Sequence, residues 1–62
     1  MSEIYEIFEK LPDGSLLFIE RVTNLERAKM RFFALTFSSG REYLVWNSTR
    51  GSEVALRTVA HA

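Results

Sequence analysis

The sequence of 62 residues contains no cysteine, one histidine, one proline and three glycines. The absence of cysteine excludes disulfides and thiolate metal sites, which support many small domains. A chain of this length forms one domain (residues 1–62) and buries only about 60% of the surface that its unfolded form exposes. Association with another chain is the remaining common source of stability, and we expect it here.

The sequence also lacks a net charge, because eight basic residues balance eight acidic ones. Phosphate-dominated binding needs a clear positive excess, so this balance argues against a nucleic-acid-binding protein. The charges are nevertheless unevenly distributed, since most of the charged residues among the first twenty are acidic and a basic stretch follows them. The basic residues of that stretch are Arg21, Arg27, Lys29 and Arg31. A nucleic-acid-binding or regulatory protein, our alternative, would need Arg27, Lys29 and Arg31 to cluster with Arg21, Arg41 or Arg57.

Long apolar runs are absent as well. The longest unbroken runs, residues 16–19 and 32–35, are far too short to cross a bilayer. The first residues show no basic region followed by an apolar core, so we expect no secretory signal. These features predict a cytoplasmic protein that does not enter a membrane.

Four segments have the β-branched and aromatic content that is typical of strands. They are residues 4–10, 15–22, 42–47 and 53–59. Between the first two, Pro12, Asp13 and Gly14 favour a three-residue hairpin loop. A turn cluster over residues 47–51 joins the last two segments. In the second segment we expect two faces, with Leu17 and Ile19 on one and Leu16, Phe18 and Val22 on the other.

Between the two predicted hairpins, the apolar residues recur with the period of a helix. Leu25, Ala28, Phe32 and Leu35 form one stripe, which we assign to the sheet. The helix is expected to run from about residue 24 to residue 37. Its first turn can be capped by Thr23 in a capping box with Glu26, or by Asn24, and Gly40 is expected to end it.

The predicted fold class is therefore α+β, of order ββαββ, in which two β-hairpins form a small sheet with one helix packed on one face. Five short runs contribute to this prediction, at residues 5–8, 11–14, 25–28, 40–43 and 49–51. In these runs the chain resembles a group of short uncharacterised bacterial ββαββ proteins. The resemblance implies this fold and no activity. The chain departs from the group at Phe33 and Phe37, where similar chains carry charges.

No set of residues in the sequence points to catalysis, a cofactor or a metal ion. The single histidine, His61, lies next to the C-terminus, and one imidazole builds neither a catalytic triad nor a histidine metal site. The three glycines are scattered and form no phosphate-binding loop. We therefore expect no enzyme, no catalytic residue, no cofactor and no metal.

Aromatic residues on a four-stranded sheet can stack on nucleic-acid bases, as in RNA-recognition modules. The candidates for this role are Phe8, Phe18, Tyr43 and Trp46. Ordinary packing on the sheet is the simpler interpretation, and the neutral charge of the chain favours it.

The helix has more apolar surface than one sheet can cover. Met30, Phe33 and Phe37 lie at i, i+3 and i+7, about 100° or more around the helix from the stripe assigned to the sheet. In one interpretation, Phe33 and Phe37 bend under the edge of the sheet. In the other, which we favour, the three residues form an exposed stripe that binds another chain.

The sequence thus predicts a small non-enzymatic association module, and we expect a homodimer because symmetric dimers are the commonest assemblies. Met30, Phe33 and Phe37 are its candidate association face. The sequence leaves open whether this stripe or the open face of the sheet forms the interface.

Overall fold

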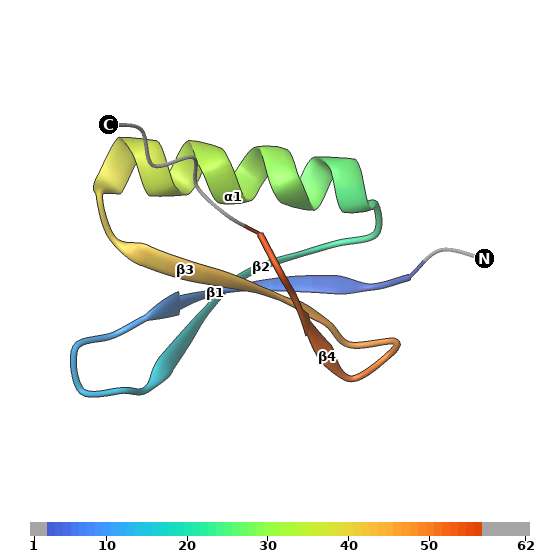
Figure 1. The fold of residues 1–62 in the computed structure, drawn as a ribbon, viewed down its shortest axis with the longest axis horizontal. Coiled ribbons are helices and arrows are strands. Elements are labelled where there is room, and N and C mark those ends of the chain that lie inside the picture. Colours follow the sequence, from blue (N-terminus) through green and yellow to red (C-terminus); the bar gives the residue numbers. More distant parts are fainter. Residues whose placement is uncertain (1–2, 57–62) are drawn as a thin grey trace.

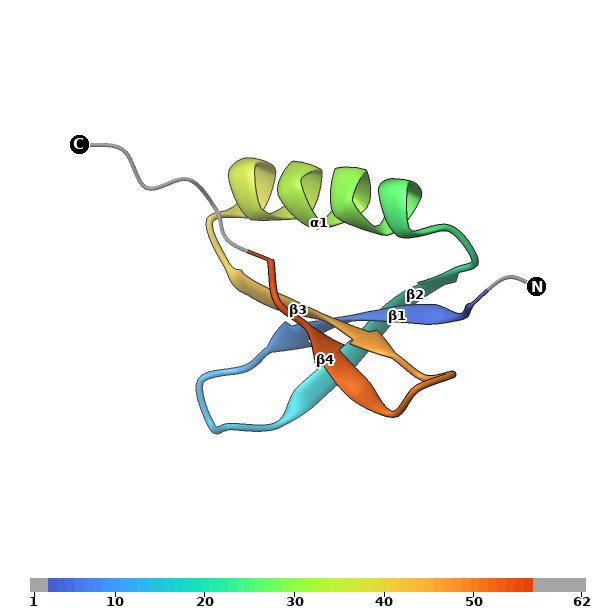
Figure 2. The same cartoon turned by 45° about the vertical axis from the view of Figure 1, so that its right-hand side comes forward.

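The computed structural model describes residues 3–56, which form one sheet and one helix (Figure 1). The elements are β1 (Tyr5–Lys10), β2 (Leu16–Val22), α1 (Leu25–Ser39), β3 (Glu42–Asn47) and β4 (Ser52–Val54). All neighbouring strands are antiparallel, and their order in the sheet is β2-β1-β3-β4. Helix α1 lies along one face of this sheet, as Figures 1 and 2 show from two directions. The predicted α+β class and ββαββ order are therefore confirmed.

The hairpin between β1 and β2 closes as the sequence predicts. The backbone N–H of Leu11 donates to the carbonyl of Ser15 at 2.9 Å, so the loop between these residues has three members. The N–H of Gly14 donates to the carbonyl of Leu11, and Gly14 has a positive φ of 90°. Glycine adopts this conformation without the steric cost that a Cβ atom adds.

A β-bulge interrupts the pairing of β1 with β2. Ile7 pairs with Glu20 and Phe8 pairs with Phe18, so Ile19 is an extra residue in β2. Beyond a bulge, the alternation of side chains changes face. Val22 therefore lies in the core, next to Tyr5, and the prediction that it shares a face with Leu16 and Phe18 is wrong.

Both ends of α1 carry predicted capping residues. Of the two candidate N-caps, Asn24 is the one in use, since its side-chain oxygen accepts from the N–H of Arg27 at 3.0 Å. At the other end, Gly40 has a φ of 71° and its N–H donates to the carbonyl of Thr36. The helix ends at Ser39, two residues later than predicted.

The core between α1 and the sheet is small. Its buried apolar residues are Tyr5, Ile7, Val22, Ala28, Phe32 and Val45. In the described part of the chain, Ile7 and Val45 are the largest side chains that are fully buried. Of the predicted helix stripe, Ala28 and Phe32 are buried, Leu35 packs at the border of the core, and Leu25 is more exposed. A monomer with this core has little buried apolar surface to stabilise it.

Strand β4 is shorter than predicted, because it ends at Val54 and Leu56 packs against the core. Three predictions lie outside the described residues: the last part of the 53–59 strand, the role of Arg57 and the role of His61. Within residues 3–56, no helix is long and apolar enough to cross a membrane.

Candidate association surfaces

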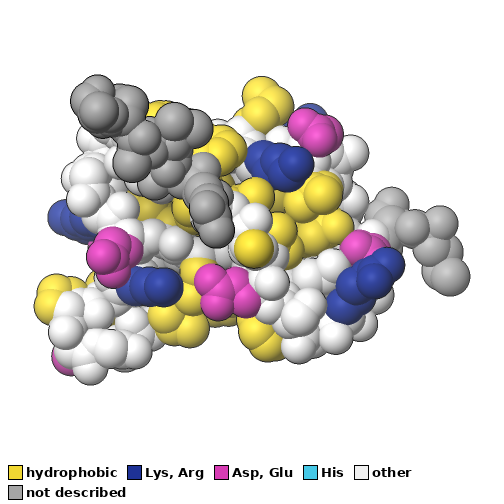
Figure 3. All heavy atoms as spheres, in the orientation of Figure 1, with side chains coloured by type: hydrophobic (Ala, Val, Ile, Leu, Met, Phe, Trp, Pro, Cys, Tyr) yellow, Lys and Arg dark blue, Asp and Glu magenta, His cyan; other side chains and the backbone are white. Residues whose placement is uncertain are grey.

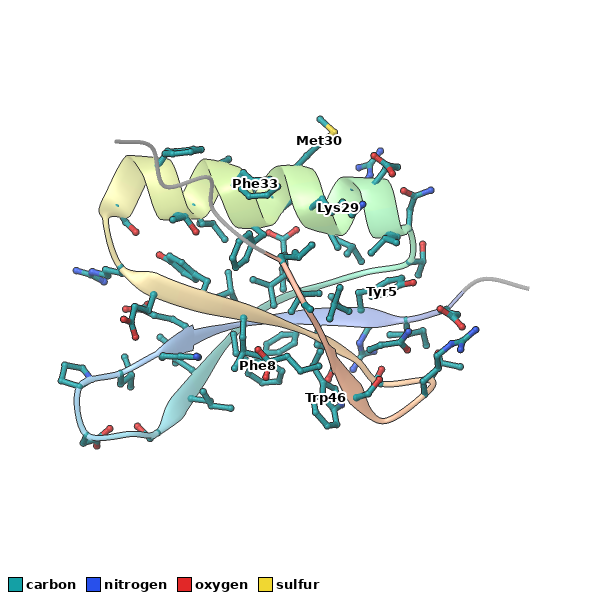
Figure 4. All side chains as sticks on the ribbon, viewed as in Figure 1. Tyr5, Phe8, Lys29, Met30, Phe33 and Trp46 are labelled. Atoms are coloured by element: carbon teal, nitrogen blue, oxygen red, sulfur yellow. The ribbon has the colours of Figure 1, made fainter. Side chains whose placement is uncertain are left out.

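The face of the sheet that points away from α1 carries a group of large apolar residues. Because successive side chains of a strand alternate between faces, the neighbours of the buried Ile7 and Val45 point away from the helix. Figure 4 shows Phe8 and Trp46 on this side. We call this surface the open face, and its large apolar residues are Phe8, Leu16, Phe18, Leu44 and Trp46. A sheet with one face on the core usually places polar residues at such positions.

The apolar residues of the open face are contiguous. Phe8 lies directly opposite Leu44 in the ladder, and its ring meets the edge of Phe18 with a centroid distance of 5.8 Å. Phe18 is 50% exposed and Trp46 is 36% exposed. A shallow hollow of about 420 Å³ on this face is bordered by Phe8, Leu16, Leu44 and Trp46, together with Glu6 and Glu53. Contiguous apolar residues with charged residues around them are typical of an interaction site, unlike single scattered apolar residues.

Charges of both signs surround the open face. On its β2 side, Arg21 pairs with Glu6 at 3.4 Å. At the end of the sheet near the first hairpin loop, Lys10 and Glu42 lie opposite each other on β1 and β3. On β4, Glu53 lies opposite Trp46. The rim therefore mixes positive and negative groups.

The predicted helix stripe is exposed only in part. Met30 points away from the sheet (Figure 4). Its side chain is 69% exposed, and that of Phe37 is 72% exposed. Phe33 instead packs at the border of the core, with its ring 5.3 Å from that of Phe32 and 6.5 Å from that of Phe37. Phe37 does not bend under the edge of the sheet. Hydrophobic side chains thus reach the surface both along the helix and beneath the sheet (Figure 3).

The basic cluster that the nucleic-acid alternative requires forms in part, and two of its arginines are paired with carboxylates. Arg21, Arg27 and Arg31 border one hollow beside the start of α1. Arg21 is paired with Glu6, and Arg31 is paired with Glu20 at 2.9 Å. Arg41 borders a different hollow and pairs with Glu9. The basic residues therefore do not form one unpaired patch for phosphates.

Of the four aromatic residues predicted as a stacking set, three share the open face. Tyr43 does not, because it neighbours Leu44 and so points to the side of the helix. There its hydroxyl hydrogen-bonds with Ser39 Oγ at 2.9 Å. Sequence reasoning also missed Leu16 and Leu44 as surface residues. The run Leu44-Val45-Trp46 was the available signal, because a strand with one polar face does not carry three apolar residues in succession.

Side chains that bind metal ions are not clustered in residues 3–56. No group of three or more histidine, cysteine, aspartate or glutamate side chains is placed there to hold a metal ion. The most densely bonded carboxylate is that of Glu3, which accepts hydrogen bonds from Arg50, Tyr5 and Asn47. These bonds connect the residues before β1 to the turn between β3 and β4, so their role is structural.

The hydrogen bond from Arg50, with those from Tyr5 and Asn47, holds the pKa of Glu3 below its ordinary value of 4.5. The folded state therefore favours the carboxylate, and its contribution is present above about pH 4.5 and is lost as the pH falls through the lowered pKa. We expect Glu3→Gln to have a lower urea midpoint than the wild type at pH 7. The difference between the two midpoints should become smaller near pH 3. The pKa of Asp13 is also lowered. Asp13 is present in both proteins, so it does not contribute to the difference between their urea midpoints. A gap that is independent of pH would contradict the role of Glu3.

Comparison of the chain with known protein families, with curated proteins and with solved structures found no match. The resemblance to short bacterial ββαββ proteins therefore stays a prediction.

Proposed function

We propose that this protein is a small non-enzymatic association module and that it forms a homodimer through the open face of its sheet. The observation that carries the proposal is the row of large apolar side chains at positions where a sheet that faces water carries polar ones. The open face has more large apolar residues than the helix stripe, and Phe33 of that stripe already packs at the border of the core.

The small core gives such a surface a second role, in stability. A domain of this length has a total stability on the order of 5 kcal/mol. Removal of apolar surface from water contributes about 25 cal/mol per Å². A standard interface of about 800 Å² per partner would cover about one sixth of the 4645 Å² surface of the chain. Dimerisation would thus add to the small stability of the monomer the part of this contribution that exceeds the cost of association.

The charges around the open face favour a second copy as the partner. A nucleic acid would meet the carboxylates of Glu6, Glu42 and Glu53 beside the aromatic rings, and like charges repel the phosphates. A rim that carries both positive and negative groups can form ion pairs with the same rim of a second copy. Two-fold dimers use the same patch on both subunits, which requires this kind of self-complementarity.

The test is a dilution series of the wild-type chain, with mass measured by light scattering and with tryptophan fluorescence recorded in parallel. Trp46 is the single tryptophan of the sequence and lies on the open face, so its emission reports on that face. We expect the mass of a dimer at high concentration, and a shift of the emission to longer wavelength as dilution exposes Trp46.

Other outcomes of the dilution series would count against this proposal. A dimer whose dissociation leaves the emission unchanged would move the interface to Met30, Phe33 and Phe37. A well-folded monomer at every concentration would refute the dimer. Tight, salt-sensitive binding of a random RNA or DNA oligonucleotide would favour the nucleic-acid alternative instead.

A further inference from the structure

The charges of the open face also define how two copies would meet. We infer, on the basis of the proposed dimer, that its two-fold axis runs parallel to the strands, between β1 and β3. This axis places Arg21 opposite the partner's Glu53, and Lys10 opposite the partner's Glu42. The inference goes beyond the choice of surface, because it fixes the orientation of the copies and names the residues that select it.

The ladder pairings divide the open face into three rows that run across the strands. The first row, from β2 to β4, contains Arg21, Glu6, Trp46 and Glu53. The middle row, from β2 to β3, contains Phe18, Phe8 and Leu44. The last row contains Leu16, Lys10 and Glu42. Charges thus lie in the outer rows and the middle row is apolar.

An axis parallel to the strands keeps each row opposite itself and reverses the order of the strands. Strand β2 then faces the partner's β4, and β1 faces the partner's β3. The positive groups of Arg21 and Lys10 meet the negative groups of the partner's Glu53 and Glu42, and each contact occurs twice. The middle row packs Phe8 against the partner's Leu44. Facing sheets normally align to within about 30°, which a small tilt of this axis provides.

The other aligned arrangement has its axis across the strands and exchanges the outer rows. It would place Arg21 on the partner's Leu16, and Trp46 on the partner's Glu42. Only Glu6 and the partner's Lys10 would have opposite charges. The axis parallel to the strands leaves one charged residue, Glu6, facing an apolar residue, the partner's Trp46, whereas the axis across the strands leaves two, Arg21 and Glu42. Charged groups that lose water without gaining a partner are costly, so the axis across the strands is disfavoured.

A charge exchange between two variants tests the orientation. Lys10→Glu alone places two carboxylates opposite each other at both symmetry-related contacts in the last row, and Glu42→Lys alone places two ammonium groups there. We expect each variant alone to dimerise more than about tenfold less tightly than the wild type, because like charges are opposed. An equimolar mixture restores opposite charges at both contacts and is expected to form heterodimers with an affinity close to that of the wild type.

Lys10 and Glu42 are exposed, so both variants should fold, and circular dichroism would verify this. Sedimentation of the separate and the mixed chains gives the readout. Weakening by Lys10→Glu without rescue in the mixture is the result expected from the axis across the strands, and would overturn the inference while leaving the dimer intact. Variants that both dimerise like the wild type would also overturn it. A monomeric wild type would instead show that the proposed function had failed.

Discussion

We expect Phe18→Lys to convert the dimer into a monomer and to leave the fold intact. Phe18 lies on the edge strand β2, and its ring contacts Phe8 in the middle row of the open face. In a symmetric dimer, one substitution introduces two ammonium groups into an apolar contact. An unpaired buried charge costs several kcal/mol, so the dissociation constant should increase more than about 100-fold. Sedimentation velocity at several concentrations would measure this increase.

The neighbouring residue provides a matched control. Leu17 is 48% exposed, against 50% for Phe18, but it lies opposite Glu9 on the other face of the sheet. Leu17→Lys therefore adds the same charge to the same strand and leaves the open face unchanged. It should dimerise like the wild type. Equal dissociation of both variants would indicate damage to β2 and not to an interface, and the absence of any effect from Phe18→Lys would exclude the open face.

Local signals in the sequence predicted most of the fold. The loop with Gly14, the end of the helix at Gly40 and the stripe of Ala28 and Phe32 each depend on residues that are close in sequence. The bulge at Ile19 was not predictable in this way. It depends on how β2 aligns with β1 across the hairpin, and one extra residue moved Val22 from the expected face to the core.

The candidate surface was predicted less well than the fold, for a physical reason. The pattern around α1 gives the direction of Met30 and Phe37 correctly, but a helical angle does not determine how far the neighbouring Phe33 reaches toward the sheet. The open face exists only when four strands are in register. Leu16 and Leu44 are far apart in the sequence. They lie on one surface because β2 and β3 both pair with β1, in registers that point the two side chains to the same face of the sheet.

The second large effect is expected from the core. Ile7 lies on the central strand β1 and is fully buried under α1. Loss of a buried isoleucine side chain to alanine costs about 2–5 kcal/mol. At about 0.05–0.15 kcal/mol per residue, the whole chain of 62 residues has about 3–9 kcal/mol of stability. We therefore expect Ile7→Ala to remove roughly half of this stability and to lower the thermal midpoint strongly, as measured by far-ultraviolet circular dichroism.

The dimer makes this loss depend on concentration. Because a partner that binds only the folded chain stabilises it by mass action, raising the concentration should raise the thermal midpoint of Ile7→Ala. Leu17→Ala, which truncates a half-exposed side chain outside the open face, should lower the midpoint far less at every concentration. If both variants lost the same stability, the core would not be centred on Ile7. If the thermal midpoint of Ile7→Ala did not depend on concentration, association would not contribute to the stability of the fold. The small core would then stabilise a single chain without a partner.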